Sequence, residues 1–160
     1  LQRPLRMVVL GTGDHGIQEG LRHLQHRDPD RFSVRFAYDE GLAHKIMAGC
    51  DIFLMPSRSE PCGLTQMYAL RYGTVPIVRT TGGLADTVEP YDPAKGKGTG
   101  FRFDNPDGTR LLWALDQALE AFRDRKAWTA LMKRGMAREF SWERSAREYV
   151  ALYRRAMGKV

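Results

Sequence analysis

The sequence feature that most constrains the fold is a strand, loop, helix and strand within residues 51–88. Residues 52–55 form an apolar run that is too short for a helix and is bounded by an aspartate and a proline, so it predicts a buried strand. A polar loop leads into a helix over 63–72, which Gly73 ends in the left-handed position. A second buried strand over 75–78 follows at once, and two strands joined by a helix predict parallel pairing.

Chemically distinctive groups gather where the first of these strands ends. Glu60 precedes the start of the helix, where Gly63, Leu64 and Thr65 offer free backbone N–H groups. Ligands of open α/β sheets bind at this end of the strands, and a helix start suits a phosphate. A carboxylate does not favour a phosphate, so its expected partner is a hydroxyl or a developing positive charge. A sugar on a nucleotide diphosphate supplies both, although a solvated loop acid explains Glu60 taken alone.

The remaining chain continues the alternation of strands and helices. This pattern predicts an α/β fold with a doubly wound, Rossmann-like parallel sheet. Further strands are expected over 7–10, 34–37 and 100–103, and helices over 17–26, 40–49, 84–88, from 107 onward, 127–138 and 141–157. The length of 160 residues predicts one domain over 1–160. The start without methionine, directly before a strand, suggests a fragment.

Composition excludes several classes of function. The net charge is +6, but the 25 Lys and Arg residues are scattered, without the aromatic and basic interleaving of single-strand binders, so no nucleic-acid partner is expected. No apolar run approaches the roughly 20 residues of a membrane span. Cys50 and Cys62 lack metal-ligand spacing and suggest a reducing, intracellular setting.

Tyr38 and the pair Gly82 and Gly83 are further candidate ligand-binding residues. Tyr38 follows the predicted strand over 34–37 and is either a ring that stacks on a base or an ordinary rim aromatic. Gly82 and Gly83 let the backbone approach a ligand or make a left-handed turn, and the residues alone leave both open.

Two segments, SEPCGLTQ and TGGLADT, carry a resemblance to a known family; both lie within SRSEPCGLTQMYALRYGTVPIVRTTGGLADTV. They resemble the signature of bacterial glycogen synthases and starch synthases, the family-five retaining glycosyltransferases. The resemblance extends from MVVLGTGD at Met7 through HKIM at His44 to FSW at Phe140. It implies the C-terminal, nucleotide-sugar-binding half of a GT-B glycosyltransferase. It also implies transfer of glucose from ADP-glucose to the non-reducing end of an α-1,4-glucan, with retention, in the cytoplasm, without metal or cofactor.

The resemblance also implies roles for individual residues. Glu60 would be the catalytic residue that holds the donor glucose and stabilises an oxocarbenium-like transition state. Tyr38 would pack on the adenine, and Arg58 and Arg79 are lower-ranked phosphate or acceptor contacts. The resemblance assigns donor binding to Tyr38, Cys62, Gly63, Leu64, Thr65, Gly82 and Gly83. The N–H groups of Gly63, Leu64 and Thr65 would bind the diphosphate. Gly82 and Gly83 would line the donor pocket.

Two departures from the pattern matter. Tyr68 stands where many related transferases carry a second glutamate that binds ribose, which agrees with the glycogen synthase branch. The family's diphosphate-binding Arg and Lys precede Leu1, as does the N-terminal domain, so the chain alone is expected to be inactive. The alternatives are another GT-B hexosyltransferase with a different donor or acceptor, and a non-catalytic glucan-binding or regulatory module.

Overall fold

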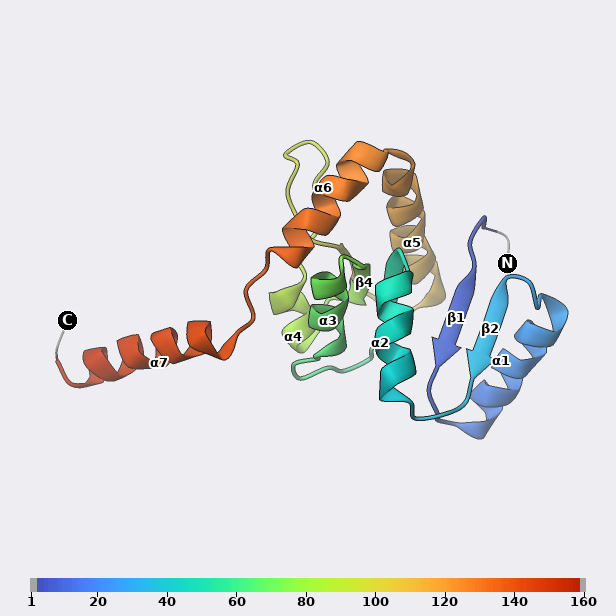
Figure 1. Cartoon of the computed structure of the whole chain (residues 1–160), viewed down its shortest axis with the longest axis horizontal. Helices are drawn as coiled ribbons and strands as arrows, with labels where there is room; N and C mark the ends of the chain where they lie inside the picture. The colour runs from blue at the N-terminus through green and yellow to red at the C-terminus, as the bar shows by residue number, and fades with distance from the viewer. Residues whose placement is uncertain (1–2, 159–160) are drawn as a thin grey trace. The chain divides into compact units, whose positions relative to one another are not determined.

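The computed structural model of the chain describes residues 3–158 and shows strands and helices in alternation (Figure 1). Contacts divide the chain into two compact units, Leu1–Gly49 and Cys50–Val160. All strand pairs in both units are parallel, so the predicted α/β fold with parallel strands is confirmed. One domain over 1–160 stays a prediction.

The first unit is a pair of parallel strands with two helices. Its elements are β1 (Met7–Leu10), α1 (His15–Arg27), β2 (Phe32–Arg35) and α2 (Glu40–Gly49). Strand β2 begins two residues earlier than predicted because its buried Phe32 pairs with Met7 of β1. Aspartates cap both helices: Asp14 accepts from the N–H of Ile17, and Asp39 accepts from that of Leu42.

The second unit contains a three-stranded sheet in the order β3-β4-β5. Its elements are β3 (Ile52–Met55), α3 (Thr65–Tyr72), β4 (Val75–Arg79), α4 (Gly82–Thr87), β5 (Phe101–Phe103), α5 (Gly108–Arg123), α6 (Arg125–Met136) and α7 (Trp142–Ala156). The predicted strands over 52–55 and 75–78 are confirmed as β3 and β4; β4 is buried over 75–78 as predicted, whereas β3 is only half-buried. The carboxyl ends of these two strands therefore lie at one edge of the sheet, where the loops of interest begin.

The core of the second unit lies on both faces of the central strand β4. On one face Val75 and Ile77 pack in a cluster with Trp128 and Leu131 of α6 and with the small residues of α5. On the other face Val78 packs with Leu84 of α4 and with Val88, which follows α4. This two-sided burial explains why β4 reads as a continuous apolar run.

Local chemistry moves several helix starts away from the predicted positions. Helix α6 begins at Arg125 because the Asp124 carboxylate accepts from the N–H groups of Lys126 and Ala127. Helix α4 begins at Gly82, two residues before the predicted 84. Helix α3 begins at Thr65, two residues after the predicted 63, which leaves Gly63 in the preceding loop.

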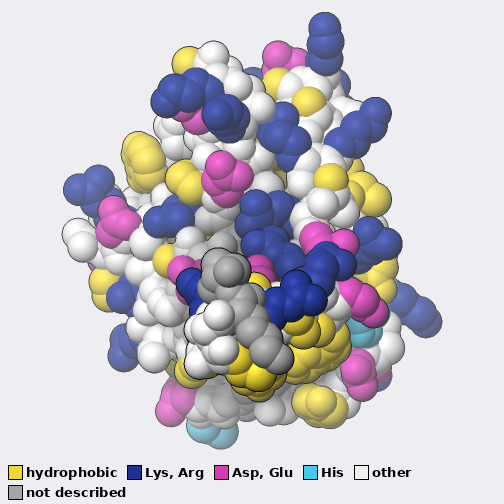
Figure 2. All heavy atoms as spheres, turned by 90° about the vertical axis from the view of Figure 1, so that its left-hand side faces the viewer, with side chains coloured by type: hydrophobic (Ala, Val, Ile, Leu, Met, Phe, Trp, Pro, Cys, Tyr) yellow, Lys and Arg dark blue, Asp and Glu magenta, His cyan; other side chains and the backbone are white. Residues whose placement is uncertain are grey.

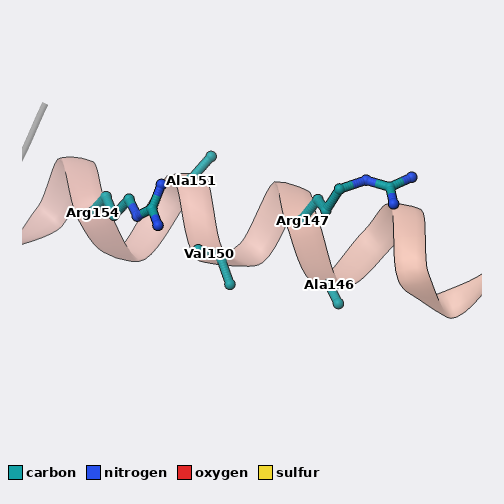
Figure 3. Close-up of a pocket in the computed structure, with 5 residues that line it drawn as sticks. All are labelled: Ala146, Arg147, Val150, Ala151 and Arg154. Carbon is teal, nitrogen blue, oxygen red and sulfur yellow. The ribbon is translucent and has the colours of Figure 1, made fainter.

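Helix α7 has no buried residue, a feature that it shares with α1. Its Trp142, Tyr149 and Tyr153 are 85%, 56% and 59% exposed, so they do not belong to a buried core of this chain. A hollow on this helix is lined by Ala146, Arg147, Val150, Ala151 and Arg154 (Figure 3). The lining side chains leave one helix in different directions, so the hollow is an open surface rather than an enclosed site.

The surface agrees with the scattered charge of the sequence. On the face seen in Figure 2, Lys and Arg side chains are interspersed with Asp, Glu and hydrophobic side chains. No helix within residues 3–158 is long and apolar enough to cross a membrane. Across the same residues no three His, Cys, Asp or Glu side chains are grouped to hold a metal ion.

Candidate functional site

The candidate site is the loop between β3 and α3, at the carboxyl edge of the sheet. Gly63 has φ +74° and Leu64 has φ −110° with ψ −33°, so a left-handed residue is followed by a right-handed one. This alternation turns successive N–H groups into a concave, anion-binding arrangement. The N–H groups of Gly63, Leu64 and Thr65 donate to no carbonyl within the described residues 3–158. They are therefore available to an anion at the positive end of α3.

Glu60 lies in the same loop, three residues before Gly63. It is half-buried, and its carboxylate has no ion-pair or hydrogen-bond partner in the part of the chain that the structure describes. Its backbone is anchored, because the Glu60 carbonyl accepts from the N–H of Gly83 at 3.3 Å. An anchored backbone with an uncommitted carboxylate suits a group that must meet a ligand.

Gly82 and Gly83 hold the loop against the start of α4. A Cβ on Gly82, whose φ is +43°, would overlap the Glu60 carbonyl oxygen, and a Cβ on Gly83 would overlap the Cys62 backbone. The Gly83 N–H also donates to the Pro61 carbonyl at 3.1 Å. Of the two uses the residues left open, the φ of +43° shows the left-handed turn at Gly82, and both glycines also approach the loop backbone closely. Their lining of a donor pocket stays a prediction.

Gln66 and Thr87 complete this arrangement, and the sequence reasoning missed both. Gln66 is fully buried, and its Nε2 lies 3.0 Å from the Cys62 carbonyl, 2.9 Å from the Gly63 carbonyl and 3.1 Å from the Thr87 hydroxyl. A signal was available: Gln66 lies four residues before Leu70, on the face that α3 buries, where a polar side chain needs a partner.

Other predicted residues of this loop have partners of their own. The guanidinium of Arg79 donates to the carbonyls of Ser57, Arg58 and Asp104, so it braces the loop from the end of β4. The Thr65 hydroxyl donates to the Met55 sulfur at 3.4 Å. Because a thioether is a weak acceptor, a phosphate oxygen would compete well for this hydroxyl.

Tyr38 and Cys62, two residues predicted to bind the donor, are both exposed. Tyr38 lies in the first unit and is 95% exposed, so its ring is open to a stacking partner. Cys62 is a free, exposed thiol in the loop itself. The other free thiol is less reactive, since burial and the neighbouring Asp51 raise the pKa of Cys50.

Comparison with known proteins identifies the family. The pattern of the family described as "Glycosyl transferases group 1" matches residues 1–133. A protein named glycogen synthase from Koribacter versatilis is 57% identical over 149 residues, which is 93% of this chain and 31% of that protein. The glycogen synthase of Thermotoga maritima is 52% identical over 157 residues, which is 98% of this chain and 32% of that protein. The chain thus spans about a third of the length of these relatives.

The solved structures agree. The catalytic domain of starch synthase IV from Arabidopsis thaliana, bound to ADP and acarbose, is 36% identical with a TM-score of 0.82. The similarity covers 96% of this chain and 32% of that one. The resemblance to glycogen and starch synthases and the C-terminal GT-B fold are thereby confirmed. Since the family pattern covers most of its residues, the chain belongs to the group 1 glycosyl transferases.

Proposed function

We propose that this chain is the donor-binding part of a retaining glycogen or starch synthase. The complete protein would transfer glucose from ADP-glucose to the non-reducing end of an α-1,4-glucan. The observation that carries the proposal is the set of unengaged N–H groups at Gly63, Leu64 and Thr65 beside the uncommitted Glu60 carboxylate. The names of the relatives, and the ADP and acarbose in the starch synthase structure, support this donor and acceptor.

The N–H groups would bind the diphosphate of the donor. Departure of the nucleotide leaves negative charge on the diphosphate, and preorganised donors at a helix start stabilise that charge without reorganising. Thr65 adds its hydroxyl once it leaves the Met55 sulfur. Exposed Tyr38 would stack on the adenine, and Cys62 would lie beside the donor.

Glu60 would act on the sugar. Its carboxylate binds hydroxyls of the donor glucose and faces the positive charge that develops as the glycosidic bond to the diphosphate breaks. Anchoring of its backbone by Gly83 keeps the carboxylate in place during this step. No metal or cofactor is assigned a part, and the reaction would take place in the cytoplasm between this part and an N-terminal domain that supplies the acceptor side.

The test is a donor assay on the complete protein with a glucan primer. ADP-glucose should support incorporation of glucose far better than UDP-glucose. Glu60→Gln should lower kcat by about 10²- to 10³-fold with little change in the KM for the donor, as loss of a group that acts in the transition state requires. Glu89→Gln, the same change at an exposed position outside the loop, is the matched control and should leave kcat unchanged.

Each alternative function predicts a different result of these assays. Preference for UDP-glucose would indicate another hexosyltransferase of this fold. Full activity of the Glu60→Gln protein would refute the catalytic assignment, and a complete protein that binds glucan without transferring glucose would be a binding or regulatory module.

A further inference from the structure

We propose that Gln66 is a positioning residue that holds the N–H groups of Gly63 and Leu64 turned toward the donor diphosphate. The inference rests on the proposed function, since it concerns the same site. Its starting point is a buried side chain whose one nitrogen serves two successive backbone carbonyls, those of Cys62 and Gly63. An amide has two N–H bonds, and these two carbonyls match them.

The geometry of the peptide bond converts these contacts into a direction for the N–H groups. The described chain contains no cis peptide, so in each peptide unit the carbonyl and the N–H point in opposite directions. The Cys62 carbonyl shares its unit with the Gly63 N–H, and the Gly63 carbonyl shares its unit with the Leu64 N–H. Because both carbonyls point at Gln66 in the interior, both N–H groups point away from it, toward the ligand side.

A side chain at position 63 would force the Gln66 amide out of its place. A Cβ there would overlap Oε1 of Gln66 and lie 2.9 Å from its Nε2, and the φ of +74° disfavours other residues independently. The left-handed turn that makes the N–H groups converge therefore depends on Gly63 and Gln66 together.

The same side chain reaches Glu60 through α4. Nε2 of Gln66 lies 3.1 Å from the Thr87 hydroxyl, which donates to the Gly83 carbonyl at 2.6 Å. The N–H of Gly83 in turn donates to the Glu60 carbonyl. This series of contacts links the direction of the N–H groups to the placement of the carboxylate.

Gln66 has one further feature that fits a positioning role. Its Oε1 is buried and has no hydrogen-bond partner among the described residues. An unpaired buried oxygen is unfavourable for stability, which an apolar side chain of the same length would avoid. The side chain is thus suited to its two N–H bonds rather than to the most stable packing.

The experiment compares binding of ADP with binding of adenosine to the complete protein by calorimetry. Gln66→Met keeps the length and burial of the side chain but removes both N–H donors. We expect the ratio of the Kd for adenosine to the Kd for ADP to fall by about tenfold to a hundredfold in Gln66→Met. Each tenfold change in Kd corresponds to about 1.4 kcal/mol, so this range matches the misdirection of one or two charge-assisted hydrogen bonds to the diphosphate. Adenosine, which has no diphosphate, should bind Gln66→Met as it binds the unaltered protein.

Two further variants separate positioning from general destabilisation. Thr87→Val should lower the same ratio by a smaller factor, because it removes the contacts of Thr87 with Gly83 and Gln66 but leaves the Gln66 amide to donate to the Cys62 and Gly63 carbonyls. It also serves if Gln66→Met does not fold. Thr74→Val removes an equally buried side chain that donates to the Cys50 carbonyl at the other end of β4, and it should leave the ratio unchanged.

The outcomes distinguish this inference from the proposed function. An unaltered protein that binds ADP no more tightly than adenosine overturns the diphosphate site itself. An unaltered protein that prefers ADP, with Gln66→Met showing the same preference or losing affinity for both ligands equally, overturns the role of Gln66 alone.

Discussion

Substitution of Gly83 by alanine tests how closely the loop must approach α4. In the structure an ideal Cβ at this position would lie 2.6 Å from Cα of Cys62, while ordinary contact begins at 3.4 Å. The neighbouring atoms are backbone, so no side-chain rotation relieves the overlap, and the loop must retreat by at least about 0.8 Å, since the Cys62 carbonyl oxygen lies closer still. That retreat also stretches the hydrogen bonds from the Gly83 N–H to the Glu60 and Pro61 carbonyls.

The expected size of the effect follows from three contributions. Overpacking of this kind costs about 1–3 kcal/mol. Weakening two backbone hydrogen bonds adds about 1 kcal/mol each. Alanine gains about 1 kcal/mol over glycine in helix propensity. The net expectation is a loss of about 2–4 kcal/mol in the free energy of unfolding, together with weaker ADP binding because the loop carries the N–H groups.

Urea denaturation followed by circular dichroism measures the first quantity, and ADP titration measures the second. Gly20→Ala is the matched control, since this helical glycine of α1 has no atom within 4 Å of an added Cβ. It should raise stability by about 0.5–1 kcal/mol and leave ADP binding unchanged. If Gly83→Ala unfolds at the same urea concentration as the unaltered protein and binds ADP equally well, the close approach of loop and α4 does not have the importance argued above.

Further predictions concern the core, the exposed ring and one charged turn. Trp128→Ala should cost about 3–5 kcal/mol in unfolding free energy, because this 1% exposed ring packs on Phe101 and Phe122. Trp128→Phe should cost much less in the same denaturation assay, because it keeps a large ring and removes a buried N–H that has no partner among the described residues. Tyr38→Ala should change stability by less than about 0.5 kcal/mol, as expected for an exposed side chain, yet weaken ADP binding in a titration, and unchanged binding would contradict the stacking role. The Lys95 ammonium and nearby N–H groups lower the pKa of Asp92. The stabilisation of this turn is therefore present above the unfolded pKa and is lost as pH falls through the lower folded pKa, which an NMR pH titration of the Asp92 carboxyl would show or refute.

Local sequence determined the order of elements and the position of the candidate site. The apolar runs at 52–55 and 75–78 are too short for helices and form strands, half-buried in β3 and buried in β4. A left-handed Gly73 ends the helix between them, with its N–H donating to the Leu70 carbonyl. These features depend on a few neighbouring residues, which is why they could be predicted. The same holds for Glu60 and the N–H groups of residues 63–65, since the carboxyl end of a parallel strand is the expected binding edge.

Tertiary structure decided which residues hold that site together. Gln66 contacts Thr87, 21 residues later, and Gly83 contacts the backbone of Cys62, also 21 residues away. Such pairs have no period or spacing in the sequence, because they depend on how α3 and α4 pack beside β4. The start of β2 at Phe32 was likewise set by pairing with β1 across the sheet rather than by its own alternation. Local propensity determines where a strand or helix can form, whereas the contacts that tie the loop and Gln66 to α4 join residues that only the fold brings together.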